Sequence, residues 1–201
     1  MSGSQVRANI TRVRALIGSH WPEVRIAAAE ALARAGAEPD VLRRALSKER
    51  NDVVTATLCE ALMLMDDQRS VTSLKNVARN HPSPLARRHA VWAVSELTGA
   101  ASVPFLRSLQ QRERSRRVQA TITAALISSG QTDELQPLLR MLASRDYLIR
   151  ISIANYLADN APRTLDCAAI LSRVRDALPG ENSNAVRAAL RKAIGVWRNN
   201  C

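Results

Sequence analysis

Aromatic side chains are scarce in this 201-residue sequence, which contains three Trp, two Tyr and one Phe. The strands of sandwiches and barrels favour aromatic and β-branched residues, so this scarcity argues against an all-β fold. Alanine and leucine instead fill 55 positions, and apolar residues make up 46% of the chain. Such a chain is apolar enough to fold despite its charge. We therefore expect an all-α protein.

Long apolar runs and cysteine motifs are also missing. No window reaches the roughly 18 uncharged apolar residues that a membrane span requires, and arginines interrupt the N-terminal segment where a signal peptide would be apolar. Cys59, Cys167 and Cys201 are widely spaced and form no Cys-x-x-Cys pair, which is typical of incidental thiols in a reducing compartment. These absences predict a cytoplasmic protein without a membrane partner.

The sequence repeats with a period of about 31 residues. An apolar residue opens each copy and is followed by further apolar residues at helical spacing; these opening residues are Val24, Val54, Ala86, Val118, Ile149 and Val186. A second helix is expected between successive copies, around Leu42, Leu74, Leu106, Leu139 and Leu171. Glycine, proline and aspartate separate the helices. The pattern predicts about six antiparallel pairs of short helices.

The run Val-Arg-x-x-Ala-x-x-Ala-Leu followed by Gly, best shown by Val24–Gly36, resembles HEAT repeats. It is most similar to the short HEAT repeats of phycobilisome lyases and related bacterial proteins. The resemblance implies an α-solenoid in which each unit buries its apolar face on its neighbours. It also implies one HEAT-like domain over residues 1–201, in which the second helices line the concave surface.

Candidate catalytic and metal-binding groups are few. None of His20, His81 and His89 is paired with a Glu or Cys at ligand spacing. HEAT-like deoxyhypusine hydroxylases carry His-Glu dipeptides as iron ligands, and this sequence has none. Nor do its seven glycines form a phosphate-binding loop. We therefore expect no enzymatic activity, no metal and no cofactor.

The positive charge follows the repeat. The chain has 26 Arg and 3 Lys against 18 Asp and Glu, a formal net charge of +11. A basic residue follows the recurring leucine of each second helix, directly or after one residue, at Arg43, Lys75, Arg107, Arg140 and Arg173. Stacked helices lie about 8–10 Å apart, so these residues would form a basic column, which the resemblance places in the concave groove. The alternative is a solvated face on which arginines pair with nearby carboxylates.

A second arginine series lies at the start of the first helices, at Arg25, Arg87, Arg150 and Arg187. The resemblance to HEAT repeats assigns it to a structural ladder between repeats.

Trp92 interrupts a largely polar repeat position and is therefore expected to be partly exposed. It would either lie against Arg88 in a cation–π contact or serve as an interface anchor. Trp197 fits the core stripe of its helix, and Trp21 is expected to pack as a hydrophobic staple at the start of a helix.

Together, these features favour a non-enzymatic scaffold or adaptor that binds an acidic protein partner on a basic concave face. The alternative is a nucleic-acid-binding HEAT-like protein, because a basic, arginine-rich chain suits phosphates. Bacterial alkylation-repair DNA glycosylases are HEAT-like, but they place several Trp or Tyr residues and a carboxylate in the groove. Here Phe105 is the only aromatic of the second helices, which disfavours that activity. A chromophore lyase or its partner subunit is a third reading. The sequence names neither the partner nor the oligomeric state.

Overall fold

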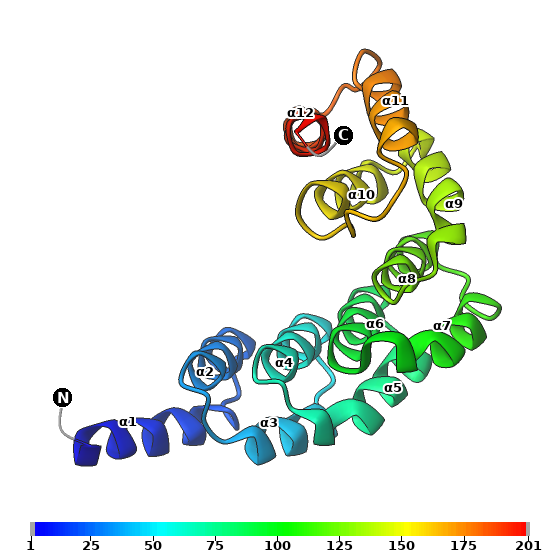
Figure 1. The fold of residues 1–201 in the computed structure, drawn as a ribbon. Coiled ribbons are helices and arrows are strands. Elements are labelled where there is room, and N and C mark those ends of the chain that lie inside the picture. The colour runs from blue at the N-terminus through cyan, green and yellow to red at the C-terminus, as the bar shows by residue number, and fades with distance from the viewer. Residues whose placement is uncertain (1–2, 200–201) are drawn as a thin grey trace. The chain divides into compact units, whose positions relative to one another are not determined.

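The structure is a computed structural model that describes residues 3–199, within which every regular element is helical (Figure 1). The chain divides into two compact units, residues 1–98 and 99–201, and each is described by itself. The expectation of one domain over residues 1–201 stays a prediction.

The first unit contains two rows of helices, with α1, α3 and α5 in one row and α2, α4 and α6 in the other (Figure 1). Helix α4 packs on both α2 and α6. The bounds are α1 Gly3–Leu16, α2 Pro22–Arg34, α3 Pro39–Leu46, α4 Asp52–Leu64, α5 Val71–Asn80 and α6 Pro84–Thr98, and the 3-10 helix η1 (Gln68–Ser70) leads into α5.

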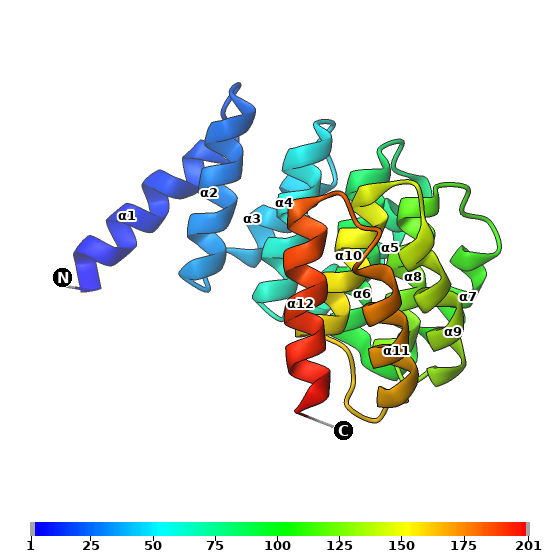
Figure 2. The ribbon, with the colours of Figure 1, turned by 90° about the horizontal axis from the view of Figure 1, so that it is seen from above.

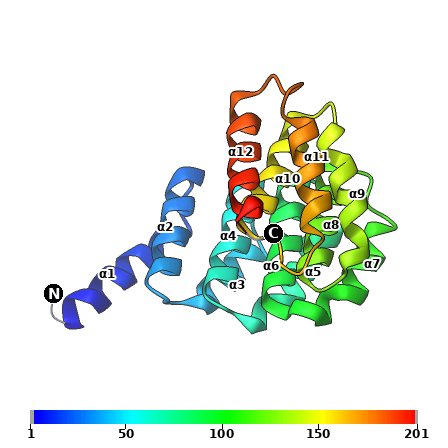
Figure 3. The same cartoon turned by 45° about the horizontal axis from the view of Figure 1, so that its top comes forward.

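The second unit continues the pattern, with α7, α9 and α11 in one row and α8, α10 and α12 in the other. Helix α12 packs on α10 and α11 (Figure 3). The bounds are α7 Val103–Gln110, α8 Arg116–Ser128, α9 Leu135–Arg140, α10 Tyr147–Asp159, α11 Cys167–Ala177 and α12 Asn184–Arg198, with 3-10 helices η2 Gly99–Ser102, η3 Thr132–Glu134 and η4 Met141–Ala143. The predicted α-solenoid of paired helices is confirmed.

Alanine-rich faces lie at the contacts of the first helices in the second unit. Ala124 and Ala125 on α8, Ala154 on α10 and Ala189 on α12 are all buried, and small side chains let helix axes approach closely. Within this unit, α8, α10 and α12 form one side and α7, α9 and α11 form the other (Figure 1).

Three first helices end in the same left-handed turn. Gly36, Asp66 and Gly130 have φ angles of 60°, 50° and 95°. After each, the next N–H bonds back to a helix carbonyl, as Gln131 does to Leu126 at 2.9 Å. This Schellman geometry satisfies carbonyls that the helix end would leave unpaired. It also turns the chain toward the second helix of the pair.

The cysteines depart in part from the expectation of incidental thiols. Cys59 is a free thiol buried in the core, and burial raises its pKa to about 12. Cys167, in contrast, is disulfide-bonded, so the expectation is wrong for this residue. Cys201 lies outside the described residues.

Candidate functional site

The five basic residues predicted from the second helices lie on five different helices. Arg43 and Lys75 belong to α3 and α5 of the first unit. Arg107, Arg140 and Arg173 belong to α7, α9 and α11 of the second unit. We call these five residues the second-helix basic positions. Their surroundings divide them into two kinds.

Arg43 is engaged within the fold. Only 14% of its side chain is exposed, and its guanidinium forms ion pairs with the carboxylates of Asp40 and Asp67. Asp67 is buried and directly follows the left-handed turn at the end of α4. The Arg43–Asp67 pair therefore ties α3 to the next turn of the stack, and its charge is balanced internally.

Arg107 repeats this contact in the second unit. Its guanidinium pairs with Asp133 at 2.9 Å and with Glu134, whose side chain is 8% exposed. Gln110 also donates to Glu134, at 3.2 Å. Burial acts to lower the pKa of Arg107, but hydrogen bonds to Asp133 and Glu134 outweigh it and raise the pKa. Like Arg43, this arginine links its helix to the turn that follows the next first helix.

Arg140 and Arg173 are of the other kind. Both are exposed, and neither forms an ion pair with any residue in the range 3–199. Lys75 is intermediate, because its side chain is half-buried on α5. Among the second-helix basic positions, Arg140 on α9 and Arg173 on α11 are therefore exposed and unpaired within the described residues. Arg43 and Arg107 instead form ion pairs that stabilise the stack of helices.

The predicted arginine ladder of the first helices is confirmed at Arg25 and Arg150. Arg25 binds Glu49 through two bonds of 2.8 and 2.9 Å, and Arg150 binds Glu181 through two bonds of 2.6 and 2.9 Å. Arg187 departs from the pattern, because it bonds to Asn184 of its own helix.

The same arginines also hold the loop in front of their helix. Arg25, Arg87 and Arg150 each donate from Nη1 to the backbone carbonyls five and six residues earlier, at 2.7–3.1 Å. Gln119, at the equivalent position of α8, keeps one of these bonds, to the carbonyl of Glu113 at 2.8 Å. The ladder is therefore a structural clamp on both neighbouring loops.

The arginines of this clamp lower the pKa of the carboxylates that they bind. The hydrogen bond from Arg150 lowers the pKa of Glu181 to about 2, against the opposing effect of burial. The pKa of Glu49 is also lowered: burial opposes the shift, but hydrogen bonds from Arg25 and from two backbone amides outweigh it. The arginine partners therefore favour the ionised form of both carboxylates.

Two of the three tryptophans have the burial that the sequence predicts. Trp92 on α6 is half-buried, as its position predicts, and Trp197 is buried, with Nε1 donating to the carbonyl of Leu157 at 2.6 Å. The staple expected at Trp21 is wrong. Its side chain is 65% exposed and contacts His20 edge-on, with ring centroids 5.6 Å apart. Nothing in the Trp21-Pro22 dipeptide distinguishes a staple from an exposed ring.

No group of three or more His, Cys, Asp and Glu side chains is placed to hold a metal ion in the part of the chain that the structure describes. Among the described helices, none is both long enough and apolar enough to cross a membrane.

Comparison with known proteins assigns the family. The family model for HEAT repeats matches residues 39–127 and 71–158, and such repeats generally mediate protein interactions. No curated protein matches the sequence. One similar solved structure is the crystal structure of an engineered protein, 14% identical, covering 96% of this chain and 97% of that chain with a TM-score of 0.45, too low to carry an argument. Because the HEAT matches span more than half of the sequence, the chain belongs to the HEAT repeat family.

Proposed function

We propose that this protein is a non-enzymatic scaffold or adaptor that binds an acidic protein partner on the surface formed by α9 and α11. The proposal rests on the positive charge of Arg140 and Arg173, which no carboxylate of the described residues balances. Both side chains are exposed on successive helices of one row, without a carboxylate partner among the described residues. HEAT repeats offer extended surfaces to partners, which fits a binding role.

The charge balance of this surface supports an acidic partner. Arg175 is also exposed on α11, and Asp176 is the only acidic residue within α9 and α11. Unpaired guanidinium groups on adjacent helices repel one another, and a negatively charged surface relieves that repulsion. The protein as a whole carries +11, so it would attract such a partner at long range, and salt would weaken the association.

Lys75 and Trp92 are the proposed contacts on the first unit. Both are half-buried, so each keeps part of its side-chain surface for contact with a partner. Single Lys75→Glu and Trp92→Ala variants test them in the experiment below.

The double variant Arg140→Glu with Arg173→Glu tests the proposal. Immobilised wild-type protein should capture acidic proteins from an extract of the source organism at low salt and release them as salt rises. We expect the variant to lose these proteins by tenfold or more, as measured by quantitative mass spectrometry, because about 1.4 kcal/mol changes an equilibrium tenfold. Nuclease treatment of the extract should leave the captured set unchanged.

The matched control is Arg12→Glu with Arg191→Glu. These arginines are exposed on α1 and α12, and the control lowers the net charge equally. It should retain the captured proteins. The proposal is wrong if the Arg140 and Arg173 variant keeps every partner, or if the control loses them to the same degree.

A further inference from the structure

A second basic surface lies on a different part of the second unit. The loops that precede α8, α10 and α12 follow one edge of this unit (Figure 2). Two of these loops, taken with the first residues of the helix that follows, span residues 111–117 and 144–147 and contain five arginines against two carboxylates, Glu113 and Asp146. We call the following residues the basic edge: Arg112, Arg114, Arg116, Arg117, Arg145 and Tyr147.

Direct contacts place the two loops next to each other. The Nε atom of Arg117 lies 2.6 Å from Oδ2 of Asp146, the residue between Arg145 and Tyr147. The hydrogen bond to Asp146, and more weakly Tyr147, raise the pKa of Arg117. Arg150 holds the second loop through the carbonyls of Ser144 and Arg145. The basic edge is therefore one anchored surface.

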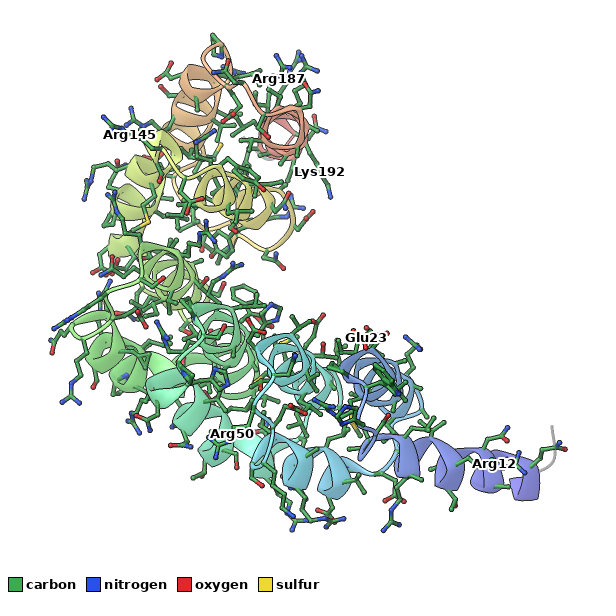
Figure 4. The ribbon with its side chains drawn as sticks, turned by 180° about the vertical axis from the view of Figure 1, so that it is seen from behind. Arg12, Glu23, Arg50, Arg145, Arg187 and Lys192 are labelled. Carbon is green, nitrogen blue, oxygen red and sulfur yellow. The ribbon has the colours of Figure 1, made fainter. Side chains whose placement is uncertain are left out.

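The two carboxylates of these loops are already engaged. Glu113 accepts a hydrogen bond from the N–H of Ser115 at 2.7 Å, and Asp146 pairs with Arg117 and caps α10 through the N–H of Leu148. The remaining arginines, Arg112, Arg114, Arg116 and Arg145, are exposed and form no ion pair with residues that the structure describes. Arg145 extends away from the helices into solvent (Figure 4).

Helix geometry adds to this positive charge. Helix α8 begins with Arg116 and Arg117 and has no acidic residue in its first turn. The N-terminus of a helix is itself the positive end of its dipole. Cations at this position repel the dipole, so an anion at the basic edge relieves both repulsions.

Tyr147 adds an exposed aromatic ring to the basic edge. Binding of a simple anion would not need such a ring. It is the first residue of α10, directly after the capping Asp146, and 51% of its surface is exposed. An exposed aromatic ring among arginines is the combination with which proteins hold single strands: bases stack on the ring, and guanidinium groups bind the phosphates. We propose that the basic edge binds single-stranded nucleic acid, with Tyr147 stacking on a base and the four open arginines contacting the backbone.

Fluorescence anisotropy with a labelled 20-nucleotide oligouridine tests the proposal. Binding should be measurable at about 50 mM salt and should weaken as salt rises, with a log–log slope of about −3 for four phosphate contacts. Replacing the four open arginines by glutamine should weaken binding about 100-fold and flatten the slope. Tyr147→Ala should weaken binding about tenfold without changing the slope, and Tyr147→Phe should retain the affinity.

Three controls separate this surface from the proposed protein-binding site. Arg140→Gln with Arg173→Gln removes exposed charge elsewhere on the same unit and should leave oligouridine binding within about twofold. A 20-residue polyglutamate peptide should bind at least tenfold more weakly than oligouridine. A 20-base-pair duplex should bind with no dependence on Tyr147, because its bases are stacked inside.

The outcomes are decisive in both directions. Absence of oligouridine binding at about 50 mM salt, equal affinity for polyglutamate, or an equal loss in the Arg140 and Arg173 variant each overturns the proposal. Circular dichroism melting verifies that the four-glutamine variant is folded, and the single Arg114→Gln variant serves if it is not. The variants of the basic edge leave α9 and α11 unchanged. Loss of oligouridine binding in these variants can therefore be distinguished from loss of the captured protein partners.

Discussion

Arg150 illustrates how single side chains hold this stack together. Its guanidinium donates to Glu181 in the following loop and to the carbonyls of Ser144 and Arg145 in the preceding loop. Arginine has five N–H donors in a planar fork, so one residue serves both loops. Lysine has a single point charge and offers no equivalent geometry.

We predict that Arg150→Ala destabilises the protein by about 2–3 kcal/mol, because it leaves the buried Glu181 carboxylate without its charged partner. The midpoint of thermal unfolding should fall by about 6 °C. Arg187→Ala is the control, since the side chain of Arg187 bonds to Asn184 of its own helix and to no carboxylate among residues 3–199, and it should cost less than about 1 kcal/mol. Equal losses in the two variants would contradict the clamp.

The same ion pair predicts a pH dependence. The folded pKa of Glu181 is about 2, below its ordinary value of 4.5. Its contribution to stability is therefore complete above about pH 4.5 and is lost as the pH falls toward 2. The melting temperature of the wild type should fall more steeply between about pH 5 and pH 2 than that of Glu181→Gln. Parallel curves for the two proteins would show that Glu181 does not titrate with folding.

At the scale of the element, the turn after each first helix determines how the pairs connect. Gly130 adopts a φ of 95° at the end of α8, and no atom lies within 4 Å of where its Cβ would be. Any cost of adding a side chain therefore comes from the backbone. Asp66 adopts a left-handed φ of 50° at the equivalent turn of α4, so this turn also forms without glycine.

Gly130→Ala should lower the free energy of unfolding by about 1 kcal/mol, because alanine is strained in the left-handed region. Gly180→Ala is the matched control: its Cβ also meets open space, and its φ is not left-handed. It should be neutral or slightly stabilising. Chemical denaturation of both variants measures the difference. A neutral Gly130→Ala would indicate that the turn relaxes to another conformation.

The elements themselves and the arginine ladder of the first helices could be predicted from the sequence, whereas the ion pairs of the second helices could not. Helical spacing of apolar residues and the position of Gly36 and Gly130 were enough to predict the paired helices and their ends. The engagement of Arg43 was not visible, because Asp67 lies 24 residues later and faces it only after the left-handed turn has formed. Arg140 shares the repeat position of Arg43 yet is exposed. Equivalent positions in a repeat therefore need not have equivalent partners.

For the molecule as a whole, the chain has 29 basic and 18 acidic residues, and three groups of its basic residues differ in their surroundings. Arg25, Arg43 and Arg150 are balanced by buried or half-buried carboxylates and stabilise the stack. Arg140 and Arg173 are open on the second-helix row, and the basic edge is open on the loops. The two surfaces of exposed arginines are the parts of this charge that the two proposed partners would contact.

Stability should also be local along the chain, because solenoid repeats interact mainly with their neighbours. Trp197 offers the sharpest probe, since it is buried and bonds to the carbonyl of Leu157 across the α10–α12 interface. Trp197→Ala should cost about 3–5 kcal/mol, and hydrogen exchange should accelerate through α10, α11 and α12. Exchange in α2, α4 and α6 should stay unchanged, as measured by mass spectrometry. Uniform acceleration of exchange across both units would instead show that the whole chain unfolds cooperatively. The stability of the stack would then not be local.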